Sequence, residues 1–425
     1  MKIALISEHA SPLATLGGVD SGGQNVYVAH LSRQLARKGH KVDIFTRCDH
    51  ESLPGIVPFA RGVRVIHIPA GPRRHIAKEE LLPYMEEFSL RMVSHCSTPS
   101  HRYDIVHANF FMSGLVGARL QQELGIPLVM TFHALGKVRR LHQQEADRFP
   151  TERMAIEELL VSRSDRIVAE CPQDRDDLIN LYDAAPERID VVGCGVDIDE
   201  LSAIGRGVAR STLNLDDEDF VVLQLGRLVP RKGVDNVIRS IGCLRRNHGI
   251  RARLLVVGGE SIEPDPIITP EIGRLAAVAD EEGVRDCVSF VGRRIRSELR
   301  NYYSAADVFV TTPWYEPFGI TPLEAMACGT PVIGAAVGGI KHTVIDEVTG
   351  YLVSPKDPDA VAERLARFHR NAELARAFGR AGIRHVRANY TWEQIARQMT
   401  AVYASALRPP RALVETSSGE DAVTV

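Results

Sequence analysis

Short apolar runs alternate with longer stretches of helical periodicity along most of the chain. In the first half the apolar runs that predict strands are KIALISE, KVDIFTR, VRVIHIP, DIVHAN, PLVMTFH, RIVAE and IDVVGCG. Helical periodicity fills most of the gaps, over residues 24–38, 78–95, 113–124 and 151–163. Because strands that alternate with helices favour a parallel arrangement, we predict a mostly parallel sheet. The first half is therefore expected to be an α/β domain.

A second series of the same kind begins after residues 199–219, which are polar and charged and carry no strand pattern. Its predicted strands are FVVLQLGRL, ARLLVVGG, VSFVGR, VFVTTP, PVIGAAV and GYLVSP. Helical patterns follow at 357–369, 372–388 and 390–407. The last has an apolar face that must be buried, formed by Trp392, Ile395, Met399 and Tyr403. We predict domains at 1–200 and 201–388, a separate helix at 389–407 and a flexible tail at 408–425.

Two doubly wound domains that face each other form a central cleft at the carboxyl ends of their strands, where ligands of such folds usually bind. The length agrees with two domains, because 425 residues exceed the size at which a single core usually keeps growing. The net charge of -3 and the lack of a long basic run argue against nucleic acid as a partner. A defined site, rather than a broad electric field, should recognise the ligands.

The cysteines and the amino terminus indicate the compartment. The chain has 7 cysteines, an odd number, widely scattered and without a C-x-x-C pair. This usage is typical of thiols in a reducing compartment and favours neither a disulfide framework nor a zinc site. The first apolar run is too short for a signal peptide, and no run approaches the roughly 20 residues that span a bilayer. We expect a soluble cytoplasmic protein, with peripheral membrane contact left open.

The glycine-rich stretch LGGVDSGGQNVYVAHL, residues 16–31, lies between the first predicted strand and the first helix. This is the usual position of a phosphate-binding loop. A P-loop would need lysine and a hydroxyl residue where Gln24 and Asn25 stand. The pairs Gly17-Gly18 and Gly22-Gly23 do not form G-x-G-x-x-G either. The loop therefore has the position of a phosphate loop, and the cations must come from elsewhere.

Another candidate for anion binding is WYEPFGITPLEAMACGTPVI, residues 314–333. Thr321 is a suitable N-cap, Pro322 suits a first helical position, and Glu324 fits a capping box. The same helix start offers free amides at 319–321, a favourable place for a diphosphate. The motif is compatible with both roles together.

Basic residues and a histidine are expected at the same cleft. Arg227 and Lys232 in GRLVPRKG follow a predicted strand, although basic residues in such loops are often only solvated surface. His133 ends the run PLVMTFH, where a lone histidine is commonly a packed or capping residue. Local sequence alone does not decide between these alternatives.

Taken together, the motifs resemble a known family. Glu316 and Glu324 form E-x7-E, and with GGVDSGGQNVY, TFHAL and GRLVPRKG they make the chain similar, over residues 1 to 407, to the retaining glycosyltransferases of family four. The first half resembles the branch of sucrose-phosphate synthase, sucrose synthase and mycothiol inositol-phosphate glycosyltransferase. The stretches that carry this likeness are GGVDSGGQNVYV, IPAGPRRHIAKEELLPYMEEF and TFHALGKVRR. The resemblance implies the α/β GT-B fold, with the last helix packed back on the first domain.

The resemblance also implies roles for individual residues. Glu324 would hold the ribose of the donor, Glu316 would face the sugar, and Arg227 and Lys232 would bind the diphosphate. His133 would contact the sugar near the reacting carbon. The catalytic set is His133, Glu316, Arg227 and Lys232, and the donor set is Gly22, Gly23, Arg227, Lys232, Arg293, Glu316, Gly319, Ile320, Thr321 and Glu324. No metal is expected, and the D-x-D triplets at Asp197-Asp199 and Asp357-Asp359 are interpreted as chance.

The acceptor is less constrained. Segments that hold an acceptor phosphate in the phosphosugar branch correspond here to Gly23, Arg74, Lys78, Phe111, Lys137 and Arg153, although exposed basic residues are the ordinary alternative. One departure is HANFFMSG, where Phe110 and Phe111 stand in place of a tyrosine common in phosphate-binding relatives. A polysaccharide or lipid-linked glycan is therefore an alternative acceptor to a phosphorylated sugar.

The predicted function is transfer of a hexose, with glucose favoured, from a UDP-sugar to a hydroxyl of a sugar, sugar phosphate or glycan, with retention. ADP and GDP donors remain alternatives. A sugar-nucleotide epimerase would need acid and base carboxylates in line and would lack E-x7-E. A non-catalytic nucleotide-sugar-binding subunit is the alternative from another class. Domain closure around the donor is expected, with hinges near 198–206 and before the last helix.

Overall fold

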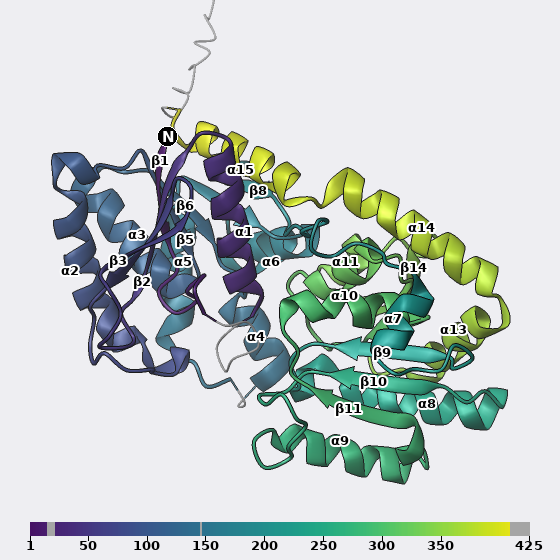
Figure 1. The fold of residues 1–425 in the computed structure, drawn as a ribbon. Coiled ribbons are helices and arrows are strands. Elements are labelled where there is room, and N and C mark those ends of the chain that lie inside the picture. Colours follow the sequence, from purple (N-terminus) through teal and green to yellow (C-terminus); the bar gives the residue numbers. More distant parts are fainter. Residues whose placement is uncertain (15–21, 145–146, 409–425) are drawn as a thin grey trace, which may run out of the picture.

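The computed structural model describes residues 1–14, 22–144 and 147–408 and consists of two α/β domains side by side (Figure 1). The part of the glycine-rich stretch that contains Gly17 and Gly18 lies outside the described residues, as does the predicted tail from residue 409. Each domain has a sheet with helices on both faces, so the predicted GT-B arrangement of two doubly wound domains is confirmed.

The first domain contains an eight-stranded sheet in the order β3-β4-β2-β1-β5-β6-β7-β8. All neighbours pair in parallel except β3 and β4. The strand order reverses beside β1, which places a crevice at the carboxyl ends of β1 and β5. The strands are β1 Lys2–Ile6, β2 Lys41–Arg47, β3 Ile56–Ala60, β4 Val63–Ile68, β5 Ile105–Asn109, β6 Leu128–Thr131, β7 Arg166–Ala169 and β8 Ile189–Val191.

Helices cover both faces of this sheet. They are α1 Gly23–Arg37, α2 Met85–Cys96, α3 Phe111–Leu124, α4 Gly136–Gln143, α5 Glu152–Arg163 and α6 Pro172–Tyr182. The predicted helix at 78–95 is interrupted: short 3-10 turns at Lys78–Glu80 and Leu82–Tyr84 precede α2. Pro83 accounts for the break, because proline has no amide hydrogen to continue a helix.

The second domain contains a six-stranded sheet in the order β11-β10-β9-β12-β13-β14, parallel throughout. Its strands are β9 Val221–Leu225, β10 Arg253–Val257, β11 Val288–Gly292, β12 Val308–Thr311, β13 Val332–Ala335 and β14 Gly350–Val353. Its helices are α7 Arg206–Thr212, α8 Val234–His248, α9 Pro270–Glu281, α10 Arg296–Ala305, α11 Ile320–Ala327, α12 Ile340–Thr343 and α13 Pro358–Arg370. Here the order reverses between β9 and β12, so a crevice faces the first domain.

Two long helices run from the second domain back to the first (Figure 1). Helix α14, Ala372–Asn389, packs on α11, and α15, Trp392–Ala406, packs on α1 and on β6 and β7. Trp392 is buried, and its ring stacks on that of His30 with centroids 5.4 Å apart. The amide of Val196 donates to the carbonyl of Tyr390 at 2.7 Å. The chain crosses between the domains twice, once after β8 and once between α14 and α15, and this hydrogen bond shows that the two crossings lie side by side.

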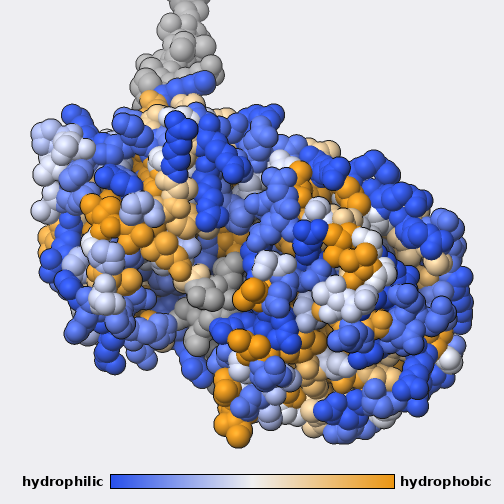
Figure 2. Space-filling view, viewed as in Figure 1, coloured by the Kyte–Doolittle hydropathy of each residue, from blue (hydrophilic) through white to orange (hydrophobic). Residues whose placement is uncertain are grey.

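No helix among the described residues is long and apolar enough to span a membrane. Figure 2 shows that the face seen in Figure 1 is mainly hydrophilic, with hydrophobic side chains gathered in several small areas. All seven cysteines are free and buried.

Candidate functional site

Loops from both sheets meet at a cavity of about 320 Å³ between the domains. On the first domain these loops follow β1, β5, β6 and β7, and on the second they follow β9 and β12. Many of the predicted residues line this cavity: Gly22, Gly23, Lys78, His133, Arg227, Lys232, Glu316, Gly319, Ile320 and Thr321. A larger cavity of about 680 Å³ lies in the second domain against α13 and α14, and none of the predicted residues line it. The interdomain cavity is therefore the candidate site.

Lys232 and Glu316 form an ion pair in this cavity, with Arg231 Nη1 3.8 Å from the same carboxylate oxygen. Burial alone would raise the pKa of Glu316, but Lys232 and Arg231 outweigh it and hold the pKa below its usual range. Burial also lowers the pKa of Lys232, against the attraction of Glu316. The excess of cations leaves this corner suited to an anion.

Two glycines hold these charged loops in place. Gly233 ends the Lys232 turn at φ 63°, where a Cβ would lie 2.0 Å from the carbonyl oxygen of Thr312. Gly338 has φ 46°, and its Cβ would lie 1.8 Å from the carbonyl oxygen of Glu316. Neither position can take a side chain without moving a charged loop.

Helix α11 begins two residues earlier than expected. Gly319, at φ 85°, is the N-cap, so Thr321 lies inside the first turn and the predicted capping box does not form. The reason is tertiary: the carboxylate of Glu324 accepts from Arg296 Nη1 at 2.9 Å and from the Tyr303 hydroxyl at 2.8 Å. Gly319, Ile320 and Thr321, which form the helix start, line the cavity, where free amides of a helix N-terminus favour an anion.

Arg296 connects Glu324 to the crossing between the domains. Its Nε donates to Glu200 Oε2 at 2.5 Å, and Glu200 follows Asp197 on the connection from the first domain to the second. Glu324 is only 3% exposed and does not line the cavity, so it is a buried neighbour of the site. The arginine neutralises this buried carboxylate, which would otherwise be costly to ionise.

His133 follows β6 at φ 59° and is held from both sides. Its Nδ1 lies 3.0 Å from Glu170 Oε1, and its Nε2 lies 3.0 Å from Asn109 Oδ1. Burial pushes the pKa of Glu170 upward, but His133 outweighs it and leaves that pKa below its usual value. The amide of Asn109 donates to two carbonyls, which assigns its oxygen to His133. Both ring nitrogens of His133 therefore lie against acceptor oxygens, which hold the ring in direction.

The glycine-rich loop reaches the cavity at the start of α1. The amide of Gly22 donates to Asn25 Oδ1 at 2.9 Å, and Asn25 Nδ2 donates to the carbonyl of Ser11 at 2.9 Å. A Cβ on Gly23 would lie 3.5 Å from the side chain of Ile320 in the second domain. Asn25, which rules out a P-loop, therefore holds Gly22 at the point where the domains approach each other.

The other predicted residues lie outside this cavity. They are Arg74, Lys137, Arg153, Phe111, Arg293 and Glu324. Phe111 is fully buried, and its neighbour Phe110 lines the cavity instead. Lys137 pairs with Glu158 at 2.7 Å, and Arg153 is 1% exposed and pairs with Glu157 at 2.7 Å. Local carboxylates hold both cations, and neither side chain lines the cavity.

Sequence reasoning missed several cavity residues, namely His9, Phe110, Arg139, Phe149, Glu170 and Arg231. One of these residues, His9, could have been found from the sequence, because its neighbour Glu8 interrupts the apolar run of the first strand. Glu8 is 1% exposed, and its Oε1 lies 2.7 Å from His9 Nδ1. A buried carboxylate at a strand end next to a histidine indicates an oriented imidazole.

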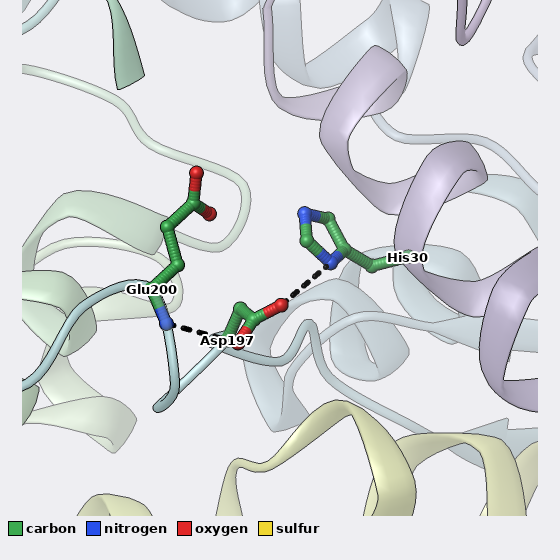
Figure 3. A group of neighbouring side chains, drawn as sticks. All are labelled: His30, Asp197 and Glu200. Atoms are coloured by element: carbon green, nitrogen blue, oxygen red, sulfur yellow. Dashed lines mark hydrogen bonds and ion pairs between the residues drawn. The ribbon is translucent and has the colours of Figure 1, made fainter. Parts of the chain in front are cut away.

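His30, Asp197 and Glu200 bring possible metal ligands within 4.8 Å of one another (Figure 3). His30 comes from α1, and the two acids come from the connection between the domains. The group is occupied by protein contacts: Asp197 accepts the amide of Glu200 at 3.2 Å, and Glu200 pairs with Arg296. An adjacent guanidinium disfavours a cation, so this group carries no metal assignment.

Comparison with known proteins gives matches over nearly the whole chain. Residues 22–195 match the family model described as "Glycosyl transferase 4-like domain", and residues 206–385 match "Glycosyl transferases group 1". The D-inositol 3-phosphate glycosyltransferase of Streptosporangium roseum is 37% identical over 96% of this chain and 93% of its own length. That of Actinosynnema mirum is also 37% identical, over 95% of this chain and 97% of its own.

Solved structures agree. Sucrose-phosphate synthase from Thermosynechococcus elongatus superposes with a TM-score of 0.86 at 34% identity, over 95% of this chain and 98% of that one. Anabaena HepE, in complex with UDP and glucose, gives a TM-score of 0.73 at 18% identity, over 95% and 100% of the two chains. The latter likeness concerns the fold alone.

Proposed function

Because the chain belongs to glycosyltransferase family four and has the GT-B fold, we propose that it transfers a hexose, with glucose favoured, from a UDP-sugar to an acceptor hydroxyl with retention. The observation that carries this proposal is the convergence of Arg227, Lys232 and the start of α11 on one cavity, opposite His133. HepE, a neighbour of the same fold, was solved with UDP and glucose, which supports UDP as the nucleotide.

The donor would lie with its diphosphate against the second domain. Lys232, Arg227 and the amides of Ile320 and Thr321 supply positive charge where the leaving group becomes more negative. These contacts are stronger in the transition state than before it, so they accelerate the reaction instead of only binding the donor. Glu316, already paired with Lys232, would then face the sugar hydroxyls.

The chemical step needs no separate base. The acceptor oxygen forms a bond to the anomeric carbon on the face that the diphosphate leaves, and the bond from that carbon to the diphosphate oxygen breaks. The electron pair stays on the diphosphate, which takes the proton of the acceptor hydroxyl. His133, whose ring Glu170 and Asn109 hold in place, would contact the sugar near the reacting carbon from the first domain. No metal is required for this scheme.

We place the reaction in the cytoplasm, where a reducing medium suits seven free, buried thiols. The acceptor would be a sugar, a sugar phosphate or a glycan. The relatives named above act on an inositol phosphate by their names, whereas Phe110, an apolar residue that lines the cavity, favours a glycan or another neutral acceptor.

The test is the release of UDP from UDP-glucose by the purified protein, with and without candidate acceptors. Turnover is expected for the wild type, and Lys232→Ala should lower kcat by about 100-fold or more because it removes a charge from the leaving group. Lys41→Ala, on the exposed end of β2, is the matched control and should leave turnover unchanged. A protein that binds UDP but never turns over UDP-glucose would instead be the non-catalytic subunit.

A further inference from the structure

The acceptor side of the cavity is walled by two aromatic rings, those of Phe110 and Phe149. Their centroids lie 5.6 Å apart, and the edge of the His9 ring lies against Phe110 with centroids 5.0 Å apart. All three residues line the cavity. This wall is apolar except for one imidazole.

The backbone of Phe110 is strained in a way that fixes this wall. Its φ of 81° and ψ of 156° fall in a region that bulky residues rarely adopt. Such a conformation persists only where the surroundings enforce it, most often at functional sites. The unfavourable backbone of Phe110 does not help α3 to form, so we attribute it to the position of the Phe110 ring in the cavity.

The arginines near this wall have their charge already balanced. The guanidinium of Arg153 lies 4.9 Å from the centre of the Phe110 ring and 4.6 Å from that of Phe149, and Glu157 accepts from its Nε at 2.7 Å. Arg139, which lines the cavity, pairs with Asp147 at 2.9 Å. Arg153 does not line the cavity, and a phosphate beside Arg139 would compete with Asp147 for its positive charge.

One polar group on the wall is oriented for hydrogen bonding. Glu8 Oε1 lies 2.7 Å from His9 Nδ1, and the hydroxyl of Ser113 donates to Glu8 Oε2. Since both oxygens of this buried carboxylate are engaged within the protein, the His9 ring is fixed in direction. Its Nε2 remains as the hydrogen-bonding atom of a residue that lines the cavity.

We propose that this subsite, formed by His9, Phe110 and Phe149, takes an uncharged sugar or polyol as the acceptor. The apolar ring face of the acceptor packs on the phenyl rings, and a hydroxyl binds His9 Nε2. Lys78 also lines the cavity, and an ammonium donates to hydroxyls as well as to phosphates. This inference rests on the proposed glycosyl transfer and departs from the phosphorylated acceptor in the relatives' names.

The test measures matched pairs of acceptors with the UDP-saturated protein by calorimetry and with UDP-glucose by UDP release. The pairs are myo-inositol and inositol 3-phosphate, glucose and glucose 6-phosphate, and fructose and fructose 6-phosphate. We expect at least one neutral member to bind, and to be used about tenfold or more better than its phosphorylated partner. A phosphorylated member that is preferred, or the failure of every neutral member to bind, overturns the inference.

Variants separate the acceptor subsite from the donor site. His9→Asn should raise the acceptor KM by about tenfold, the equivalent of one lost hydrogen bond, and leave the Kd of UDP unchanged. Glu8→Gln keeps the shape of the side chain beside His9 but removes its charge. It should raise the acceptor KM by less than His9→Asn does. An exposed control, His50→Asn, should change neither.

An unchanged acceptor KM in folded His9→Asn overturns the role of His9. If the wild type fails to bind UDP at all, the proposed function itself fails, and this result is distinct from binding UDP while preferring a phosphorylated acceptor.

Discussion

Individual residues set the chemistry of the cleft through neighbours far away in sequence. Lys232 faces Glu316, His133 faces Glu170, and Glu324 faces Arg296. The resemblance to family four predicted the first member of each pair, whereas local sequence alone left their roles open. Neither revealed Glu170 or Arg296, since nothing local marks a partner that only the fold brings close. Thr321 illustrates the limit: the N-cap predicted there was wrong, because Gly319 caps α11 and Glu324 is held by Arg296 instead.

Gly338→Ala tests how tightly Glu316 is positioned. The new Cβ would lie 1.8 Å from the carbonyl oxygen of Glu316, so the loop must move and carry its carboxylate away from Lys232. We expect kcat/KM for UDP-glucose to fall by about 100-fold, as small misplacements at reacting centres do. Gly207→Ala, at an exposed helical position with open space around the added carbon, is the control. Equal activity of both variants would contradict the tight positioning.

The buried His30 should make the folded protein less stable to unfolding in acid. Burial, with Arg296 next in weight, lowers its pKa from 6.5 to about 4. Between these values the unfolded chain binds more protons than the folded one, so the free energy of unfolding falls as pH falls, by up to about 1.4 kcal/mol per unit. Urea unfolding at pH 7 and pH 4.5 should show a smaller difference for His30→Asn than for the wild type or His50→Asn. The same difference in all three proteins would show that His30 is not the titrating group.

The elements were largely predictable because the strands are apolar and separated by amphipathic helices. The exception among strands is β3, an antiparallel edge strand of partly exposed residues that contains Pro58. Helix α7 was also missed, in the segment expected to be a polar linker. There Arg210 is fully buried and donates to Asp307 Oδ2 at 2.8 Å, 97 residues away in sequence. Such a helix depends on a contact that local sequence does not show.

Helix α10 is predicted to influence the donor site through its first residue. Arg296→Gln removes the ion pair that orients Glu324 and its link to Glu200, so the Kd of UDP should rise by about tenfold, the value of one charged hydrogen bond. Calorimetry measures this change. The control is Arg274→Gln, which breaks an exposed pair with Glu271 on α9 and should have little effect. An unchanged Kd in a folded Arg296 variant would leave Glu324 with no part in donor binding.

At the scale of the whole molecule, two neighbouring chain segments join the domains, and side chains of the two domains also contact each other directly. Lys341 Nζ lies 2.5 Å from Gln173 Oε1, and the Tyr315 ring stacks on His142 with centroids 5.3 Å apart. We expect UDP to favour this arrangement by bridging the two lobes. X-ray scattering should then show a smaller radius of gyration with UDP than without, and no change in Lys232→Ala. Identical profiles for the wild type with and without UDP would contradict closure around the donor.

The central claim is that the second domain grips a nucleotide diphosphate between the lobes, and a crystal structure of the protein with UDP tests it most directly. The account predicts the diphosphate within about 3 Å of Lys232 Nζ and of the amides that begin α11, with Arg227 directed at it. A nucleotide bound anywhere else, with Lys232 still engaged only with Glu316, would contradict it.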